Sequence, residues 1–112
     1  MPTLDLQPTH RRLLLDLLAR HAPDAEVWVY GSRVNGLSHE GSDLDLVVRY
    51  STESMRERLR SRALLSEALD ESNLPILVEV QDWAQMTEDM RREAERCHVV
   101  LRTPAAVSSH AK

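Results

Sequence analysis

The sequence has 112 residues, enough for one domain and too few for two domains of ordinary size. Hydrophobic residues make up 42% and charged residues 29%, values typical of a globular protein with a well-solvated surface. The net charge of −4 argues against a broad basic surface, so direct binding of duplex nucleic acid is not expected.

The sequence also gives no sign of export or of a membrane span. Its apolar runs are far shorter than the roughly 18 residues that cross a bilayer. The amino terminus lacks the charged-then-apolar order of a secretory signal. The single cysteine, Cys97, excludes an intramolecular disulfide, and these features together predict a cytoplasmic protein.

The first predicted element is a helix over residues 8–21, with Pro8 suited to its first position. It carries five leucines: Leu13, Leu14, Leu15, Leu17 and Leu18. At about 100° per residue these spread over an arc of roughly 200°, wider than a helix on a single core usually needs. The extra leucines, Leu15 above all, then either pack under a loop or the carboxy-terminal segment or form an interface with a second copy or a partner protein.

Four segments rich in β-branched and aromatic residues are predicted to be strands. They cover residues 25–30, 43–50, 76–82 and 98–102. The segment between the first two strands, residues 31–42, holds all three glycines and is expected to be a loop.

Two further helices are expected. The first covers residues 53–71, with an arginine-rich, solvated face at its start. Its apolar stripe is formed by Met55, Leu59, Leu65 and Leu69. The second covers residues 88–96, with Thr87 as its N-cap.

The order α-β-β-α-β-α-β predicts an α/β (α+β) domain, a mixed β-sheet with helices packed against it. We expect this domain to occupy residues 1–103. The small, polar residues 104–112 are expected to form a flexible tail.

Two aspartates open the second predicted strand. Side chains alternate across a strand, so Asp43 and Asp45 project from the same face. Their mutual repulsion would be relieved by a divalent cation, and Mg²⁺ favours a few carboxylate oxygens completed by water and substrate phosphates. The pair therefore indicates a metal site.

A Gly-Ser turn lies at the end of the preceding strand. Gly31 allows close approach of the backbone to a ligand, and free N–H groups at a tight turn form an anion-binding concavity. Ser32 adds a hydroxyl and Arg33 a positive charge. Together with the aspartates, this turn would hold a metal–nucleotide complex.

Glu79 is the candidate for a third carboxylate, because a charge inside an apolar strand is costly unless it is paired or binds a metal. Each feature alone has an ordinary explanation: a simple turn, a solvated strand end, or an edge-facing glutamate. The combination, with strands placed around it, favours a functional site.

"GSRVNG" followed by "SDLDLVV" resembles the minimal nucleotidyltransferases of the DNA polymerase β superfamily, whose pattern is Gly-Ser, ten residues, then Asp-x-Asp. The end of the chain, "ILVEVQDWAQMTEDMRREAERCHVVL", resembles their third strand, last helix and final strand. The resemblance implies the nucleotidyltransferase fold and transfer of a nucleoside monophosphate from a triphosphate, with pyrophosphate leaving.

The resemblance also implies roles for individual residues. Gly31 and Ser32 would hold the triphosphate with help from Arg33. Asp43 and Asp45 would bind two Mg²⁺ ions, and Glu79 would take the third carboxylate position, where the family usually has aspartate.

Many such proteins are antitoxins that attach AMP from ATP to a HEPN-type toxin, so the resemblance implies a protein adenylyltransferase with such a partner. A second hypothesis is an antitoxin that binds nucleotide and neutralises its partner by binding, with weak or no catalysis. The longer side chain of Glu79 keeps this second hypothesis open.

Overall fold

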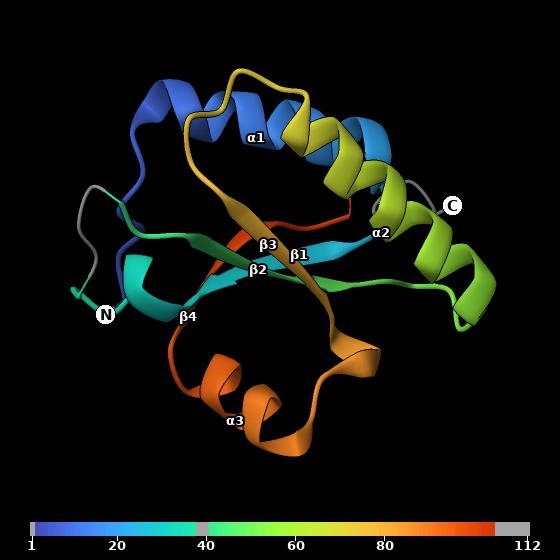
Figure 1. Ribbon diagram of the computed structural model, residues 1–112. Helices are drawn as coiled ribbons and strands as arrows, with labels where there is room; N and C mark the ends of the chain where they lie inside the picture. Colours follow the sequence, from blue (N-terminus) through green and yellow to red (C-terminus); the bar gives the residue numbers. More distant parts are fainter. Residues whose placement is uncertain (1, 38–40, 105–112) are drawn as a thin grey trace, which may run out of the picture.

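The computed structural model describes residues 2–37 and 41–104, which form a four-stranded sheet with α-helices on both faces (Figure 1). The elements are α1 (Pro8–His21), β1 (Glu26–Tyr30), the 3₁₀ turn η1 (Gly31–Arg33), β2 (Leu44–Arg49), α2 (Met55–Asp70), β3 (Val78–Asp82), the 3₁₀ turn η2 (Trp83–Gln85), α3 (Glu88–Arg96) and β4 (His98–Arg102). The predicted α/β (α+β) class and element order are confirmed. The bounds of α1, α3 and β4 match the prediction, and the turn η2 was not predicted.

The strand order is β3-β2-β1-β4. β1 is antiparallel to both of its neighbours, whereas β2 and β3 are parallel. Parallel neighbours need a crossover connection, and α2 provides it. The sheet is therefore mixed, as predicted.

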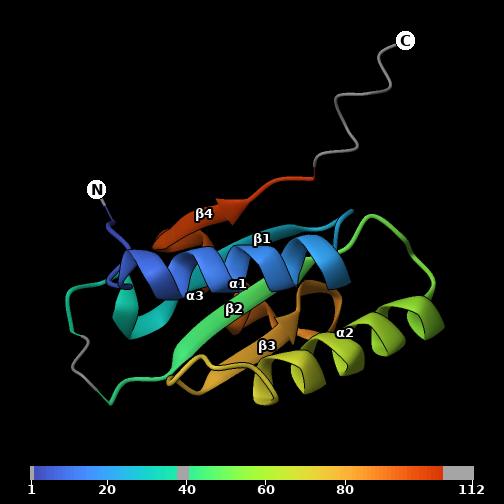
Figure 2. The same cartoon turned by 90° about the horizontal axis from the view of Figure 1, so that it is seen from above.

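The helices lie in two layers. α1 and α2 cover one face of the sheet, and η2 and α3 cover the other (Figures 1 and 2). Alternation along β2 divides its side chains between the faces: Leu44, Leu46 and Val48 join the main core with α1 and α2. Val47 packs on the opposite face with Trp28 and with residues of η2 and α3. β2 is thus fixed from both sides; it carries Asp45, whereas Asp43 lies directly before its first residue and not within the strand as predicted.

The leucines of α1 all belong to this core. Leu14, Leu17 and Leu18 are buried, and Leu13 and Leu15 are half-buried against the same cluster. The extra leucines therefore pack within the chain, against the main core. The expectation that Leu15 forms an exposed interface is wrong.

The apolar stripe predicted for α2 is only half correct. Leu65 and Leu69 are buried, but Met55 and Leu59 are 55% and 49% exposed. The first turns of α2 extend past the end of the sheet (Figure 2). Arg58, from the arginine run expected to be solvated, is buried in their place because it pairs with Asp82.

The predicted flexible tail, residues 104–112, lies outside the described residues except for Pro104. In the described part of the chain, no helix has both the length and the apolar character that crossing a membrane requires.

Candidate active site

Four polar side chains form a row across the face of the sheet that α3 partly covers. Register places Tyr30 of β1 opposite Asp45 of β2, and Asp45 opposite Glu79 of β3. On the other side of β1, Tyr30 is paired with His98 of β4. Paired residues on adjacent strands share a face, so Asp45 and Glu79 stand side by side. The predicted third carboxylate thus neighbours the predicted metal-binding pair.

Gly31 joins the two halves of the motif. Its φ of +84° lies in the left-handed region, which favours glycine. A Cβ atom at this position would lie 2.6 Å from Oδ2 of Asp45, closer than Cβ atoms come to other heavy atoms in folded proteins. The glycine turn and the aspartate strand are therefore in direct contact, which is the arrangement that the sequence predicts.

Ser32 lies inside the short turn η1, directly after Gly31. The turn closes through a hydrogen bond from Val34 N to Gly31 O at 3.1 Å. Ser32 is half-buried and directly follows the glycine that packs against Asp45. This position is consistent with a hydroxyl that donates to a phosphate oxygen.

Arg33 does not stand as an open positive charge. It is buried, with its Nε and Nη2 atoms 3.2 and 2.9 Å from the carbonyl oxygen of Ser42. Its Nη1 atom donates to the carbonyl oxygen of Asp5 at 2.9 Å. These contacts give Arg33 a positioning role at the base of the loop that precedes Asp43.

The three carboxylates differ in their exposure. Asp43 and Glu79 are exposed, whereas Asp45 is half-buried. Burial is the largest cause that raises the pKa of the Asp45 carboxyl, followed by repulsion from Glu79 and then from Asp43. Burial also raises the pKa of the Tyr30 hydroxyl, with smaller contributions from Asp45 and Glu79. The site is therefore a region of concentrated negative charge.

A hard cation fits this donor set better than a soft one. All the ligands offered are carboxylate oxygens, which Mg²⁺ prefers, and their mutual repulsion would fall on cation binding. Within residues 2–37 and 41–104, no three His, Cys, Asp or Glu side chains are already grouped so as to hold a metal ion. Mg²⁺ usually takes one or two carboxylates and completes its shell with water and phosphates. Carboxylates that stand partly open to solvent therefore suit a metal ion that arrives with a nucleotide.

The position of Glu79 corrects one argument from the sequence. Glu79 was expected to be a costly charge within an apolar strand, but β3 is an edge strand and the side chain is exposed. Its exposure gives no energetic reason to bind a metal. Its candidacy depends instead on its register opposite Asp45.

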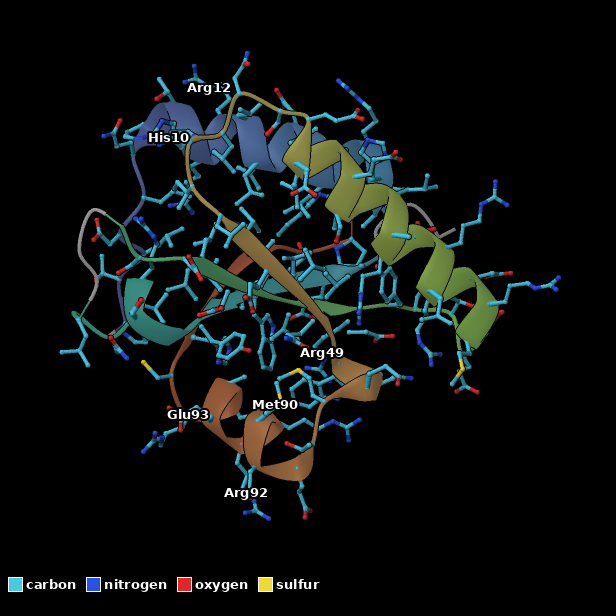
Figure 3. All side chains as sticks on the ribbon, viewed as in Figure 1. His10, Arg12, Arg49, Met90, Arg92 and Glu93 are labelled. Carbon is cyan, nitrogen blue, oxygen red and sulfur yellow. The ribbon has the colours of Figure 1, made fainter. Side chains whose placement is uncertain are left out.

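Aromatic rings support the site from the α3 side. Trp28 is 5% exposed, stacks on His98 at 3.8 Å between ring centroids, and meets Trp83 edge-on at 5.5 Å. The guanidinium of Arg49 lies over both tryptophan rings, 4.8 and 4.5 Å from their centroids. Figure 3 shows Arg49 between the sheet and α3, with Met90 reaching toward the same layer. These rings pack against one another and against Arg49, so they do not form an open platform for a base.

A family model described as "Nucleotidyltransferase domain" matches residues 10–101. The chain belongs to the nucleotidyltransferase family. This nucleotidyltransferase is 38% identical to the "Probable protein adenylyltransferase MntA" of Haemophilus influenzae over 98 residues, which cover 88% of this chain and 83% of the relative.

Solved structures agree with this assignment at the level of the fold. A toxin–antitoxin complex with AMP-PNP has a chain that matches with a TM-score of 0.61 and 20% identity, over 88% of this nucleotidyltransferase and 77% of that chain. A complex of the tri-AMPylated Shewanella oneidensis HEPN toxin with its MNT antitoxin matches with a TM-score of 0.57 and 17% identity, over 93% and 78%. The nucleotidyltransferase fold implied by the sequence motifs is thereby confirmed.

Proposed function

We propose that this chain is a Mg²⁺-dependent protein adenylyltransferase that transfers AMP from ATP to a HEPN-type toxin and so acts as its antitoxin. The observation that carries the proposal is the packing of Gly31 against Oδ2 of Asp45, with Glu79 in register beside it. The similarity to MntA and the fold shared with MNT antitoxins support the choice of a protein acceptor.

The chain's own residues would do the positioning that this reaction needs. The backbone of Gly31 and the hydroxyl of Ser32 would bind the phosphates, while Asp43, Asp45 and Glu79 would hold the metal. Two Mg²⁺ ions, when bound, would neutralise charge on the attacking and leaving oxygens. Phosphoryl-type transfer depends mainly on positioning and charge neutralisation, so no reactive side chain is required from this protein.

In the overall reaction, the acceptor hydroxyl oxygen forms a bond to the α-phosphorus of ATP. The bond between the α-phosphorus and the bridging oxygen to the β-phosphate breaks, and the hydroxyl proton is released. Pyrophosphate leaves with the electron pair of that bond. A cytoplasmic location, where ATP and the partner are both present, fits this reaction and the lone Cys97.

The test is incubation of this protein with Mg²⁺, its purified HEPN-type partner and ATP labelled at either the α- or the γ-phosphate. We expect label on the partner from α-labelled ATP only, and none with the double variant Asp43→Asn/Asp45→Asn. Label from γ-labelled ATP would instead show phosphorylation and would refute nucleotidyl transfer.

The alternative is a nucleotide-binding antitoxin that neutralises its partner by binding alone, and the exposed, longer Glu79 favours it. It predicts that the double variant, though unable to transfer, still suppresses the toxin fully. Loss of suppression in that variant, with its binding to the partner retained, would favour the catalytic proposal.

A further inference from the structure

Arg33 connects three separate parts of the chain. Its side chain donates to Ser42 O through Nε and Nη2 and to Asp5 O through Nη1, and its own carbonyl oxygen accepts from Asp5 N at 2.8 Å. The turn η1, the residue before Asp43 and the segment before α1 therefore meet at one guanidinium. Only 7% of Arg33 is exposed, and its two bonds to Ser42 O are buried, whereas its bond to Asp5 O is partly buried.

The two contacts at Asp5 form a reciprocal pair. The Asp5 backbone gives its N–H to Arg33 and receives an N–H from the Arg33 side chain. Both atoms of Asp5 belong to the main chain, so the pair holds the path of the amino-terminal segment whatever side chain stands there. Leu4 and Leu6, on either side, pack against the main core and anchor the same segment.

These contacts of Arg33 lie between the two halves of the candidate site, the Gly-Ser turn and the aspartates. Ser32 directly precedes Arg33, and Asp43 directly follows Ser42. The Ser42 carbonyl is held by two N–H groups of the same planar guanidinium, which fixes its direction as well as its distance. A change at Arg33 would therefore change the separation between the phosphate-binding turn and the first metal-binding carboxylate.

We infer that Arg33 and the Asp5 backbone form a brace that positions Ser32 and Asp43, so that the segment before α1 is part of the active-site framework. This inference depends on the proposed nucleotide site. Arg33 is in this account a positioning residue and does not itself contact the triphosphate.

The brace and a direct phosphate contact predict different results. Asp5→Pro removes the N–H that Arg33 accepts, without changing any charge near the phosphates beyond the Asp5 side chain. Asp5→Ala removes the same side chain and keeps the N–H, so it is the matched control. Thr3→Pro, at an exposed position, controls for proline in this segment.

The measurements are Mg²⁺-ATP affinity by calorimetry and hydrogen exchange of the backbone amides around Ser32 and Asp43. We expect Asp5→Pro to weaken affinity by about tenfold to 100-fold relative to Asp5→Ala and to speed exchange at both places. Arg33→Lys keeps the positive charge but lacks the planar set of guanidinium N–H donors, so we expect it also to weaken affinity and speed exchange. Thr3→Pro should behave as the parent protein.

Chemical rescue supplies a second readout that general unfolding would not produce. Arg33 lines a cavity of about 480 Å³ with Gln7, His10 and Ile76, which gives small molecules a route to its position. Methylguanidinium added to Arg33→Ala should restore slow exchange and nucleotide affinity, whereas methylammonium should not.

The outcome that overturns the inference is unchanged affinity and exchange in Asp5→Pro. Retained affinity in Arg33→Lys together with loss in Arg33→Ala would show direct recognition of phosphate charge, which also overturns it. A third outcome separates the two ideas. If the parent protein binds no nucleotide but Asp5→Pro still speeds amide exchange around Ser32 and Asp43, the brace is supported and the proposed function is refuted.

Discussion

Arg58 and Asp82 form a buried ion pair between α2 and the end of β3, with Nε 3.0 Å from Oδ2. The other oxygen of Asp82 accepts from the backbone N–H of Ala84 at 3.0 Å and so caps η2. The pair therefore fixes both the crossover helix and the turn that leads to α3. Neither residue belongs to the candidate site.

We predict that Arg58→Met destabilises the fold by about 3–5 kcal/mol, because it leaves Asp82 charged and unpaired at 2% exposure. The measurement is urea unfolding. Arg60→Met, at an exposed position on the same helix, should change the free energy of unfolding by less than about 0.5 kcal/mol. Equal effects of the two substitutions would show that the pair contributes nothing specific.

Gly31 and Gly36 offer a matched pair of variants that tests the candidate site. Gly31 and Gly36 have φ values of +84° and +83°, so alanine at either position costs roughly 1–2 kcal/mol of backbone strain. At Gly31 the new Cβ would lie 2.6 Å from Oδ2 of Asp45, whereas at Gly36 no atom of residues 2–37 or 41–104, apart from Gly36 itself and its chain neighbours, lies within 4 Å of it. We expect Gly31→Ala to abolish AMP transfer and Gly36→Ala to retain it, with similar losses in melting temperature. Equal activity in the two variants would contradict the close-packed motif.

Asp45 is predicted to lower stability at neutral pH. Its pKa is raised in the folded state, so folding becomes less favourable as pH rises from the ordinary aspartate value through the raised one. Asp45→Asn should therefore raise the melting temperature at pH 7 and give little gain at about pH 4. Transfer activity should fall by at least about 100-fold.

The control for this prediction is Asp43→Asn, since Asp43 is exposed and should yield a smaller stabilisation. A lower melting temperature for Asp45→Asn at pH 7 would show that the carboxylate makes a stabilising contact, contrary to the electrostatic argument.

Glu79 is predicted to be a working third ligand. Glu79→Gln should lower transfer strongly, by on the order of 100-fold, while Glu79→Asp should preserve or raise it. Because the side chain is exposed, Glu79→Asp should leave thermal stability unchanged, whereas Glu79→Gln should raise it slightly by removing repulsion from Asp45; melting curves provide the control. Transfer at the parent rate by Glu79→Gln would assign Glu79 to the solvated surface and favour the binding-only alternative.

Local patterns were enough to predict most of the fold and the contact between the motif halves. The predicted cap at Thr87 is confirmed by its bond from Met90 N at 3.2 Å. The shared face of Asp43 and Asp45 stays a prediction, because β2 begins at Leu44, after Asp43. The partners of Arg58 and Arg33 could not be predicted in this way. Arg58 looks like any other arginine of a solvated run until β3 brings Asp82 beneath it. Arg33 looks like a phosphate ligand until the carbonyls of Asp5 and Ser42 are seen to surround it. Both depend on contacts between distant segments, for which a single sequence carries no local signal.

Because β2 and β3 are parallel, the residues of the candidate site come together in two steps as the chain folds. Gly31, Ser32, Asp43 and Asp45 come from one antiparallel pair of strands and its connecting loop, so their contacts are local in the chain. Glu79 reaches Asp45 only after the whole of α2 has crossed over and docked. Closing such a long connection costs chain entropy before any strand contact is gained. A chain interrupted before β3 would therefore lack the carboxylate that stands beside Asp45. If the proposed function holds, full affinity for a metal–nucleotide complex would appear only once the crossover has folded.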